Sequence, residues 1–226
     1  FLQSRSAKAV RLLLLPKTEV SARMRREPWK LKDVVMMAIL GVLFAVVYMA
    51  VFYGGTAISV ALTPLGLSAF GFELIYGVWF MAATIAAYII RKPGAALITE
   101  VLASAIELLM GNSGGATVVL TGLIQGVGCE LGFAVFRYRK YNLLSMALSG
   151  VFAAVCIFCY ELYYLSYYLL APTMLAAQLA VRFASAVVFS GVIAKLACDG
   201  LARTGVLRSY AVGARLAPVS IDDEEE

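Results

Sequence analysis

Glu73 provides a carboxylate at the start of an apolar segment, and two aromatic residues follow it at helical spacing. Tyr76 comes one turn after Glu73, and Trp79 comes one turn after Tyr76. A heteroaromatic ring can stack on such side chains while the carboxylate accepts its hydrogen bonds or balances a positive charge. The spacing therefore predicts a binding site for a cationic heterocycle, with Tyr76 and Trp79 as stacking groups.

Further polar groups lie in or beside apolar stretches, where an ionisable side chain is costly and marks a candidate functional site. Counting ~1.5 Å per residue from the nearest loop places a set of them in the same half of a bilayer as Glu73. These groups are Glu107, Asn112, Glu161 and Arg182. We expect them to converge on one outward-facing pocket, with Glu107 as a second charge partner. The residues expected to orient the ligand are Asn112, Gln125 and Glu161.

Other charged groups have a simpler interpretation. Glu100, Glu130 and Lys195 lie deeper, toward the opposite side, and are expected to form interhelical ion pairs or hydrogen bonds. Arg182 has two interpretations, because it can neutralise a carboxylate of the protein or contact a ligand. Carboxylates still outnumber basic groups within the spans, so a cationic ligand suits the site.

The composition identifies a polytopic membrane protein. The chain has 226 residues, 62% of them hydrophobic and 15% charged, and a mean hydropathy of +0.87. Soluble domains are about 45–50% apolar and about 25% charged. The Lys and Arg residues cluster before residue 33, at 91–92, at 137–140 and after 202. Basic clusters beside apolar spans indicate the cytoplasmic side of a membrane rather than nucleic-acid binding.

We expect an all-α protein with six transmembrane helices and both termini in the cytoplasm, because this topology puts every basic cluster on one side. The spans are expected at about 34–53, 73–90, 93–110, 116–136, 143–170 and 174–201. A Gly/Pro-rich linker is expected at 54–72, and Pro93 is expected at the first position of its helix. The domains are then a basic cytoplasmic leader (1–30), a six-helix membrane domain (31–207) and a cytoplasmic tail (208–226).

Small residues form a stripe on the first span. Ala38, Gly41 and Ala45 lie on one face of it, which allows close helix contact. The stripe can pack against other helices of the same chain or against a separate membrane subunit, and the sequence leaves both open.

Catalysis by this chain is not expected. The sequence has no histidine and no recognisable nucleophile–base spacing, and Cys156 and Cys159 form a lone C-x-x-C without the further ligands of a closed zinc site. There is no phosphate-binding G-x-x-x-x-G-K-[ST] motif, so any ATP hydrolysis belongs to a partner. No cofactor is expected. The alternatives are an autonomous secondary carrier for a cationic heterocycle and an intramembrane enzyme that uses Glu100, Glu107 and Glu130.

Several stretches resemble the S components, the substrate-binding membrane subunits, of energy-coupling factor (ECF) vitamin transporters, in particular the YkoE type linked to thiamine or its hydroxymethylpyrimidine moiety. They are ELIYGVWF (73–80), AYIIRKPGAAL (87–97), ELLMGN (107–112), QGVGCE (125–130) and DGLARTGVL (199–207). The stripe of small residues resembles the contact that this family makes with its coupling subunit, although Val42 stands where the family pattern has a second alanine.

The resemblance implies a vitamin-capturing subunit of an ATP-driven importer in the bacterial plasma membrane. Its partners are a transmembrane coupling subunit, a pair of cytoplasmic ATPases and a small molecule such as thiamine. Thiamine fits the predicted chemistry, because its aminopyrimidine offers hydrogen-bond donors and a stacking face, and its thiazolium carries a positive charge.

Overall fold

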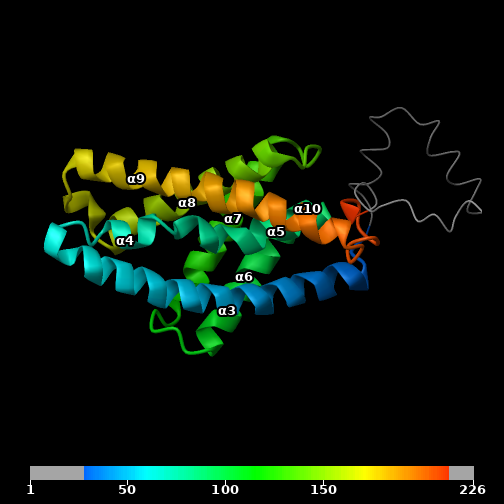
Figure 1. The fold of residues 1–226 in the computed structure, drawn as a ribbon, viewed down its shortest axis with the longest axis horizontal. Coiled ribbons are helices and arrows are strands. Elements are labelled where there is room, and N and C mark those ends of the chain that lie inside the picture. Colours follow the sequence, from blue (N-terminus) through cyan, green and yellow to red (C-terminus); the bar gives the residue numbers. More distant parts are fainter. Residues whose placement is uncertain (1–27, 214–226) are drawn as a thin grey trace, which may run out of the picture.

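A computed structural model describes residues 28–213 of the chain, and within this range the protein contains helices and no strands (Figure 1). Short 3₁₀ and π segments interrupt or extend the α-helices. The elements are α3 (Leu31–Leu62), η1 (Thr63–Leu65), α4 (Phe70–Glu73), η2 (Tyr76–Phe80), α5 (Met81–Ile90), α6 (Ala95–Leu109), α7 (Thr117–Val135), α8 (Leu143–Tyr164), η3 (Tyr167–Leu169), α9 (Pro172–Ala186), η4 (Val187–Ile193, a π-helix) and α10 (Ala194–Arg203).

The first helix is longer than predicted. The expected linker at 54–72 is wrong over its first half, because α3 continues through Gly54 and Gly55 to Leu62. Gly55 is a site of close contact: a Cβ there would lie 2.6 Å from the ring of Phe72. Gly55 therefore lets the returning chain pack against α3, and neither glycine ends the helix.

The second predicted span is not one continuous helix. The short α4 ends at Glu73, and a 3₁₀ segment, η2, follows from Tyr76 before α5 begins at Met81. A Cβ at Gly77 would lie 2.2 Å from the carbonyl oxygen of Ser185, so the irregular backbone of η2 lies directly against α9. Irregular backbone at membrane depth occurs where it is buried in protein or lines a cavity.

The start of α6 also differs from the prediction. Pro93 precedes the helix, which begins at Ala95 after Gly94 takes a left-handed conformation with φ of 90°. Glu130 of α7 satisfies the helix start, because its carboxylate accepts hydrogen bonds from the backbone N–H groups of Gly94 (2.6 Å), Ala96 and Leu97. Glu130 is thus a structural anchor, in line with its predicted role.

The ends of the last two long helices were placed incorrectly. The helix predicted at 143–170 ends at Tyr164, and Ser166 has a left-handed backbone with φ of 55°. The helix predicted at 174–201 begins earlier, with Pro172 in its first turn, and runs to Arg203 through the π segment η4. A Cβ at Gly150 of α8 would lie 1.9 Å from Oγ of Ser190, so η4 passes very close to α8.

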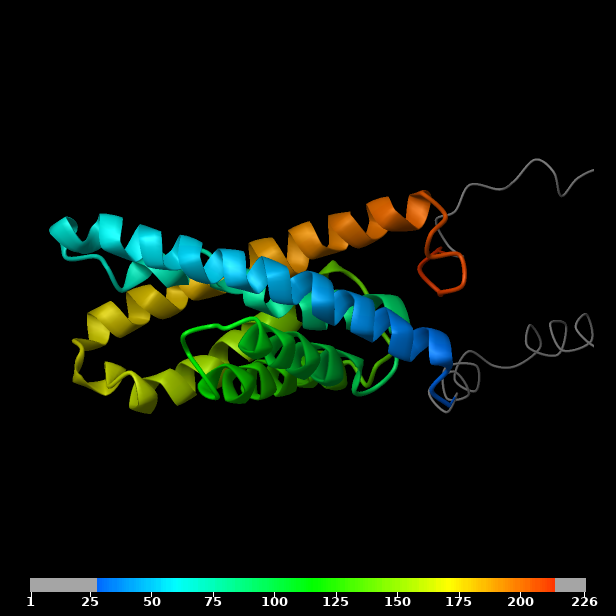
Figure 2. The same cartoon turned by 90° about the horizontal axis from the view of Figure 1, so that it is seen from below.

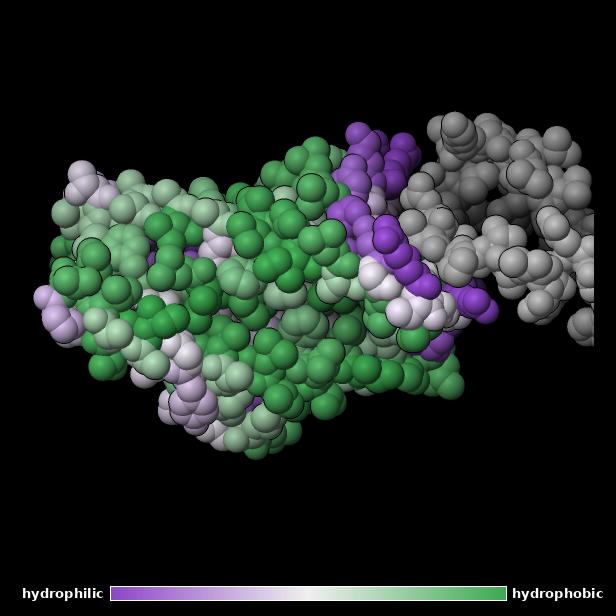
Figure 3. All heavy atoms as spheres, viewed as in Figure 1, coloured by the Kyte–Doolittle hydropathy of each residue, from purple (hydrophilic) through white to green (hydrophobic). Residues whose placement is uncertain are grey.

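Within residues 28–213, four helical stretches are long and apolar enough to cross a membrane: Leu31–Leu65, Thr117–Val135, Leu143–Tyr164 and Pro172–Arg203. Tyr76–Ile90 is a shorter apolar stretch, and α6 has 15 residues with two carboxylates among them. Hydrophobic residues cover most of the face in Figure 3, and hydrophilic residues gather near one end. The chain is a multi-pass membrane protein, while the count of six spans stays a prediction.

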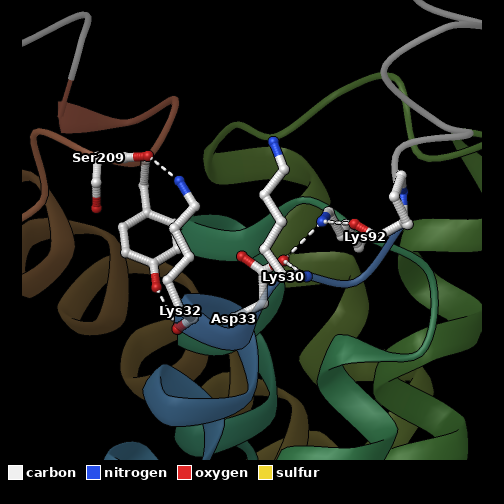
Figure 4. A network of polar contacts seen from close by, with 7 residues as sticks. Lys30, Lys32, Asp33, Lys92 and Ser209 are labelled. Atoms are coloured by element: carbon white, nitrogen blue, oxygen red, sulfur yellow. Dashed lines mark hydrogen bonds and ion pairs between the residues drawn. The ribbon is translucent and has the colours of Figure 1, made fainter.

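Both ends of the described chain lie at the same end of the molecule (Figures 1 and 2). Figure 4 shows the polar contacts that join them: the Tyr210 hydroxyl donates to the Lys32 carbonyl oxygen (2.6 Å), and the Lys32 ammonium donates to the carbonyl oxygen of Ser209. Lys92 forms an ion pair of 2.6 Å with Asp33 nearby. Burial raises the pKa of Tyr210, so its hydroxyl stays protonated and able to donate.

The predicted leader (1–30) lies almost entirely outside the described residues, and so does most of the predicted tail (208–226). The first part of that tail packs on the helical domain, because Tyr210 and Val212 are buried. The stripe on α3 also packs within the chain: Gly41 and Ala45 are buried, and a Cβ at Gly41 would lie 3.0 Å from Leu102 of α6. Its Ala38 end is exposed.

The α7–α8 contact depends on glycine. A Cβ at Gly132 would lie 2.3 Å from Cα of Ser149, and backbone atoms cannot yield as a flexible side chain can. We predict that Gly132→Ala lowers the stability by about 1–3 kcal/mol, as overpacking does. Gly200→Ala is the matched control, because a Cβ there meets nothing within 4 Å. Thermal unfolding in detergent checks both, and equal melting temperatures for the two variants would contradict the close contact.

Candidate functional site

A cavity of about 260 Å³ lies between the irregular second segment and the long helices, close to the lower size limit of small-molecule sites. The structure brings all seven predicted ligand-binding residues into its lining: Glu73, Tyr76, Trp79, Glu107, Asn112, Gln125 and Glu161. Arg182 lines it as well. The convergence is a finding about geometry, and the contact of these residues with a ligand stays a prediction.

Arg182 occupies the centre of an ion-pair network in the cavity wall. Its Nε and Nη2 each donate to one carboxylate oxygen of Glu73 at 2.6 Å, which is the bidentate geometry of a strong pair. Its Nη1 lies 2.6 Å from Oε2 of Glu161. Arg182 is only 1% exposed, so the three side chains join α9, α4 and α8 in a buried cluster. Arg182 therefore neutralises carboxylates of the protein, which was one of its two interpretations.

Tyr76 connects this network to Trp79 and the other aromatic residues that line the cavity. Its hydroxyl donates to Oε1 of Glu161 at 2.6 Å, and the guanidinium of Arg182 lies 3.9 Å from the centre of its ring. One face of the Tyr76 ring is thus covered by a cation. Its centroid lies 5.5 Å from that of Trp79, so the two predicted stacking residues adjoin.

Glu107 and Asn112 form a second polar cluster where α6 ends. The Asn112 amide donates to Oε1 of Glu107 at 2.7 Å, and its carbonyl oxygen accepts from the backbone N–H of Gly114 at 2.8 Å. Gly111, with φ of 92°, turns the chain so that Asn112 points back at the helix. No described basic side chain forms an ion pair with Glu107, so the protein itself provides no cation for this carboxyl group.

Glu100 also lines the cavity, although its sequence position predicted a deeper location with only structural contacts. Tyr48 lines the cavity too and was not predicted. The Tyr48 hydroxyl lies 2.9 Å from Oε2 of Glu100 and 2.8 Å from the carbonyl oxygen of Trp79. Tyr48 is an aromatic residue within an apolar helix, so no sequence signal separates it from ordinary core residues.

The aromatic wall is larger than the sequence indicates. Phe52, Phe72 and Tyr48 join Trp79 in it, with ring centroids 6.1 Å apart for Phe72 and Trp79. Tyr160 and Tyr164 stack at 5.2 Å and also line the cavity, as does Tyr167. Tyr163 and Tyr168 of the same tyrosine-rich segment have exposed side chains and do not line the cavity. The pattern of the sequence does not distinguish the two groups.

Other candidate groups lie elsewhere. Lys195 pairs with Asp199, whose second carboxylate oxygen accepts from the Tyr88 hydroxyl at 2.8 Å, and all three lie outside the cavity. The four cysteines are free. Between residues 28 and 213, no group of three or more Cys, Asp or Glu residues has the arrangement of a metal site.

Four carboxylates and a single guanidinium line this cavity together with a row of aromatic rings. In a helical membrane protein, a cavity lined by several carboxylates is typical of proteins that bind a small polar ligand within the bilayer.

Comparisons with known proteins identify the family. The chain is 38% identical over 188 residues to YkoE of Bacillus subtilis (strain 168), whose name describes it as an HMP/thiamine permease, and the match covers 83% of this chain and 92% of that protein. A crystal structure described as an S-component of an ECF transporter matches with a TM-score of 0.79 and 37% identity, covering 84% of this chain and 93% of the other. Residues 32–156 match the family described as "ABC-type cobalt transport system, permease component".

The chain belongs to the family of ECF transporter S components. Its relatives are transport proteins and not enzymes, so the expectation that this chain is no enzyme agrees with its family.

The Arg182 network yields a stability prediction. Arg182→Gln leaves Glu73 and Glu161 buried without a cation, which is expected to cost about 3–5 kcal/mol. Adding Glu73→Gln to this variant should restore part of the loss, because one uncompensated charge is removed. Thermal unfolding of the single and double variants measures the coupling. Lys195→Gln is the control, because its ion pair is partly exposed and is expected to contribute under about 1 kcal/mol.

Proposed function

We propose that this protein is the substrate-capturing S component of an ATP-driven ECF importer and that it binds thiamine or its hydroxymethylpyrimidine moiety. The observation that carries the proposal is that carboxylates, amides and aromatic rings line one cavity. The chain belongs to the S-component family, and its relative YkoE is named an HMP/thiamine permease. This name supports thiamine or hydroxymethylpyrimidine as the substrate.

The residues have distinct proposed roles. Trp79 and Tyr76 stack on the ligand, and Glu107 balances the thiazolium charge. Asn112 and Gln125 orient the ligand through their amides. Glu73 and Glu161 both pair with Arg182. Their proposed role is mainly to fix the position of the cavity lining, and two carboxylates with one guanidinium leave one negative charge in this cluster.

The transport cycle requires partners that this chain does not provide. We propose a transmembrane coupling subunit and a pair of cytoplasmic ATPases, as the S-component family implies, in the bacterial plasma membrane. The proposed topology has six spans with the leader 1–30 and the tail 208–226 in the cytoplasm. Its support is the common end at which both described chain ends lie and the basic residues that gather there (Figures 1 and 4).

The substrate is tested by titrating thiamine into the detergent-solubilised protein while tryptophan fluorescence is followed. Trp79 lines the cavity, whereas Trp29 lies near Lys92, outside it. We expect saturable quenching that Trp79→Phe abolishes and Trp29→Phe leaves intact. Absence of quenching in the folded, ligand-free wild type would contradict thiamine as the substrate. Persistence of the signal in Trp79→Phe would instead place the ligand elsewhere.

The charge of the ligand gives a second prediction. Glu107→Gln removes a carboxylate without a basic partner but keeps an acceptor and the shape of the side chain. It should weaken binding of cationic thiamine by about tenfold, in the range of a hydrogen bond or contact to a charged group, and weaken binding of neutral hydroxymethylpyrimidine much less. Competition titrations of both ligands check this, and equal losses for the two would assign Glu107 a role unrelated to charge.

The coupling to ATP is tested by reconstitution. The protein alone in liposomes should bind thiamine but not accumulate it, whether or not an ion gradient is imposed. Co-reconstitution with the coupling subunit and ATPases should give uptake that needs ATP. Accumulation by the lone protein driven by an ion gradient would indicate an autonomous secondary carrier instead.

A further inference from the structure

The loop between α7 and α8 presents three exposed cations. Arg137, Arg139 and Lys140 follow the end of α7, and none of them forms an ion pair in the described part of the chain. The Lys140 ammonium lies 5.9 Å from the ring centre of Phe136, a contact that leaves its charge without an acid. The loop therefore concentrates positive charge on the surface of the subunit.

No acidic group described near this loop is free to neutralise it. Arg91, at the end of α5, lies over the ring of Tyr141 in the loop at 5.4 Å, and the adjacent Lys92 pairs with an aspartate in the first turn of α3. Among residues 28–213, the carboxylates outside the cavity are already engaged. Two form ion pairs with Lys92 and Lys195, and Glu130 accepts hydrogen bonds from the start of α6. The loop thus needs an anion from outside the helical domain.

The backbone fixes the direction of these cations. Arg137 and Tyr138 both have left-handed conformations, with φ of 54° and 56°, which are costly for residues other than glycine. Tyr138 and Tyr141 pack against the core, and the Tyr141 ring stacks on Phe133 with the centroids 5.6 Å apart. Because the two tyrosines pack inward, the basic side chains beside them are left outward. Costly backbone that holds charged groups in one direction is typical of a binding site.

The loop also lies at the depth of lipid headgroups. The 19 residues of α7 give it a length of about 28 Å, close to the hydrocarbon core of about 30 Å. Exposed apolar side chains adjoin the loop on both helices: Leu131 and Val135 of α7, and Leu143 and Leu144 of α8. Exposed apolar groups followed directly by exposed cations match a phospholipid, with its acyl chains beside the helices and its phosphate at the loop.

We propose that the α7–α8 loop is a binding site for an anionic phospholipid of the adjacent membrane leaflet. Arg137 and Arg139 hold the phosphate, because guanidinium groups form paired hydrogen bonds with phosphate oxygens, and Lys140 adds a third positive charge. The site lies outside the cavity and involves no transported substrate, so it goes beyond the proposed function. A lipid bound here holds the shared end of α7 and α8 at the membrane surface.

The test measures which lipids the protein retains. Protein is released from vesicles that contain phosphatidylglycerol and phosphatidylcholine with identical acyl chains, and native mass spectrometry counts the lipids bound to it. We expect the wild type to prefer phosphatidylglycerol by at least about fivefold, the factor that one basic residue near a membrane surface contributes. Arg137→Gln/Arg139→Gln should reduce this preference by about fivefold or more.

The matched control is Arg203→Gln/Arg208→Gln, which also removes two exposed arginines but lies after α10. It should change the preference by less than about twofold, because salt screens charges outside the site. Equal retention of the two lipids by the wild type, or equal losses in the two variants, would overturn the site. If the first variant fails to fold, Arg139→Gln/Lys140→Gln provides the same test and leaves the left-handed pair unchanged.

Two further arms distinguish other anions from a lipid. Excess inorganic phosphate should not displace the bound phosphatidylglycerol, because it lacks the acyl chains, and displacement would contradict a phospholipid site. The chain also carries an acidic run at 222–226. Replacing these five acids by their amides should leave the lipid preference unchanged, whereas a rise would assign the loop to that run and overturn the lipid as its occupant.

Discussion

The ion pair between Arg182 and Glu73 holds the irregular backbone between α4 and α5 in place. Both side chains are 1% exposed, and the guanidinium also contacts Glu161, so one cation joins α9, α4 and α8. The backbone between α4 and α5 lacks the regular hydrogen bonds of a long helix, and it needs neighbours that fix it in place. Arg182 contacts one end of this segment. Ser185, at the next turn of α9, contacts it as well, because its hydroxyl accepts a hydrogen bond from the Gly77 N–H at 3.0 Å.

The cavity follows from that break in the second segment. A continuous helix would turn Glu73, Tyr76 and Trp79 at fixed angles of 100° per residue, whereas the 3₁₀ segment places Tyr76 on Glu161 and brings Trp79 beside Tyr48. The glycines of α7 then allow α6 to approach closely, and Glu100 of α6 and Gln125 of α7 both line the same space. The irregular backbone and the small residues together leave space for polar groups. Regular packing of continuous helices would fill this space.

The sequence predicted which residues line the cavity better than it predicted the limits of the surrounding helices. Charged and amide residues within apolar stretches are costly, which made five of the seven predicted positions recognisable, and Tyr76 and Trp79 were recognised by their helical spacing from Glu73. All seven line the cavity. Tyr48 and Phe72 escaped notice because a buried aromatic residue in an apolar helix is ordinary. The helix limits at Gly54 and Pro93 were wrong for a different reason: tertiary contacts with Phe72 and the Glu130 carboxylate decide there, and local turn signals do not record them.

The length of α3 has a mechanical consequence. Its 32 residues extend about 48 Å, against a hydrocarbon core of about 30 Å. The helix must therefore lean strongly or project past the lipid at its Leu62 end, where Val60 and Leu65 expose apolar side chains. Because leaning α3 also leans the helices packed on it, the resting tilt of the whole subunit depends on membrane thickness, and a thicker bilayer holds it more upright.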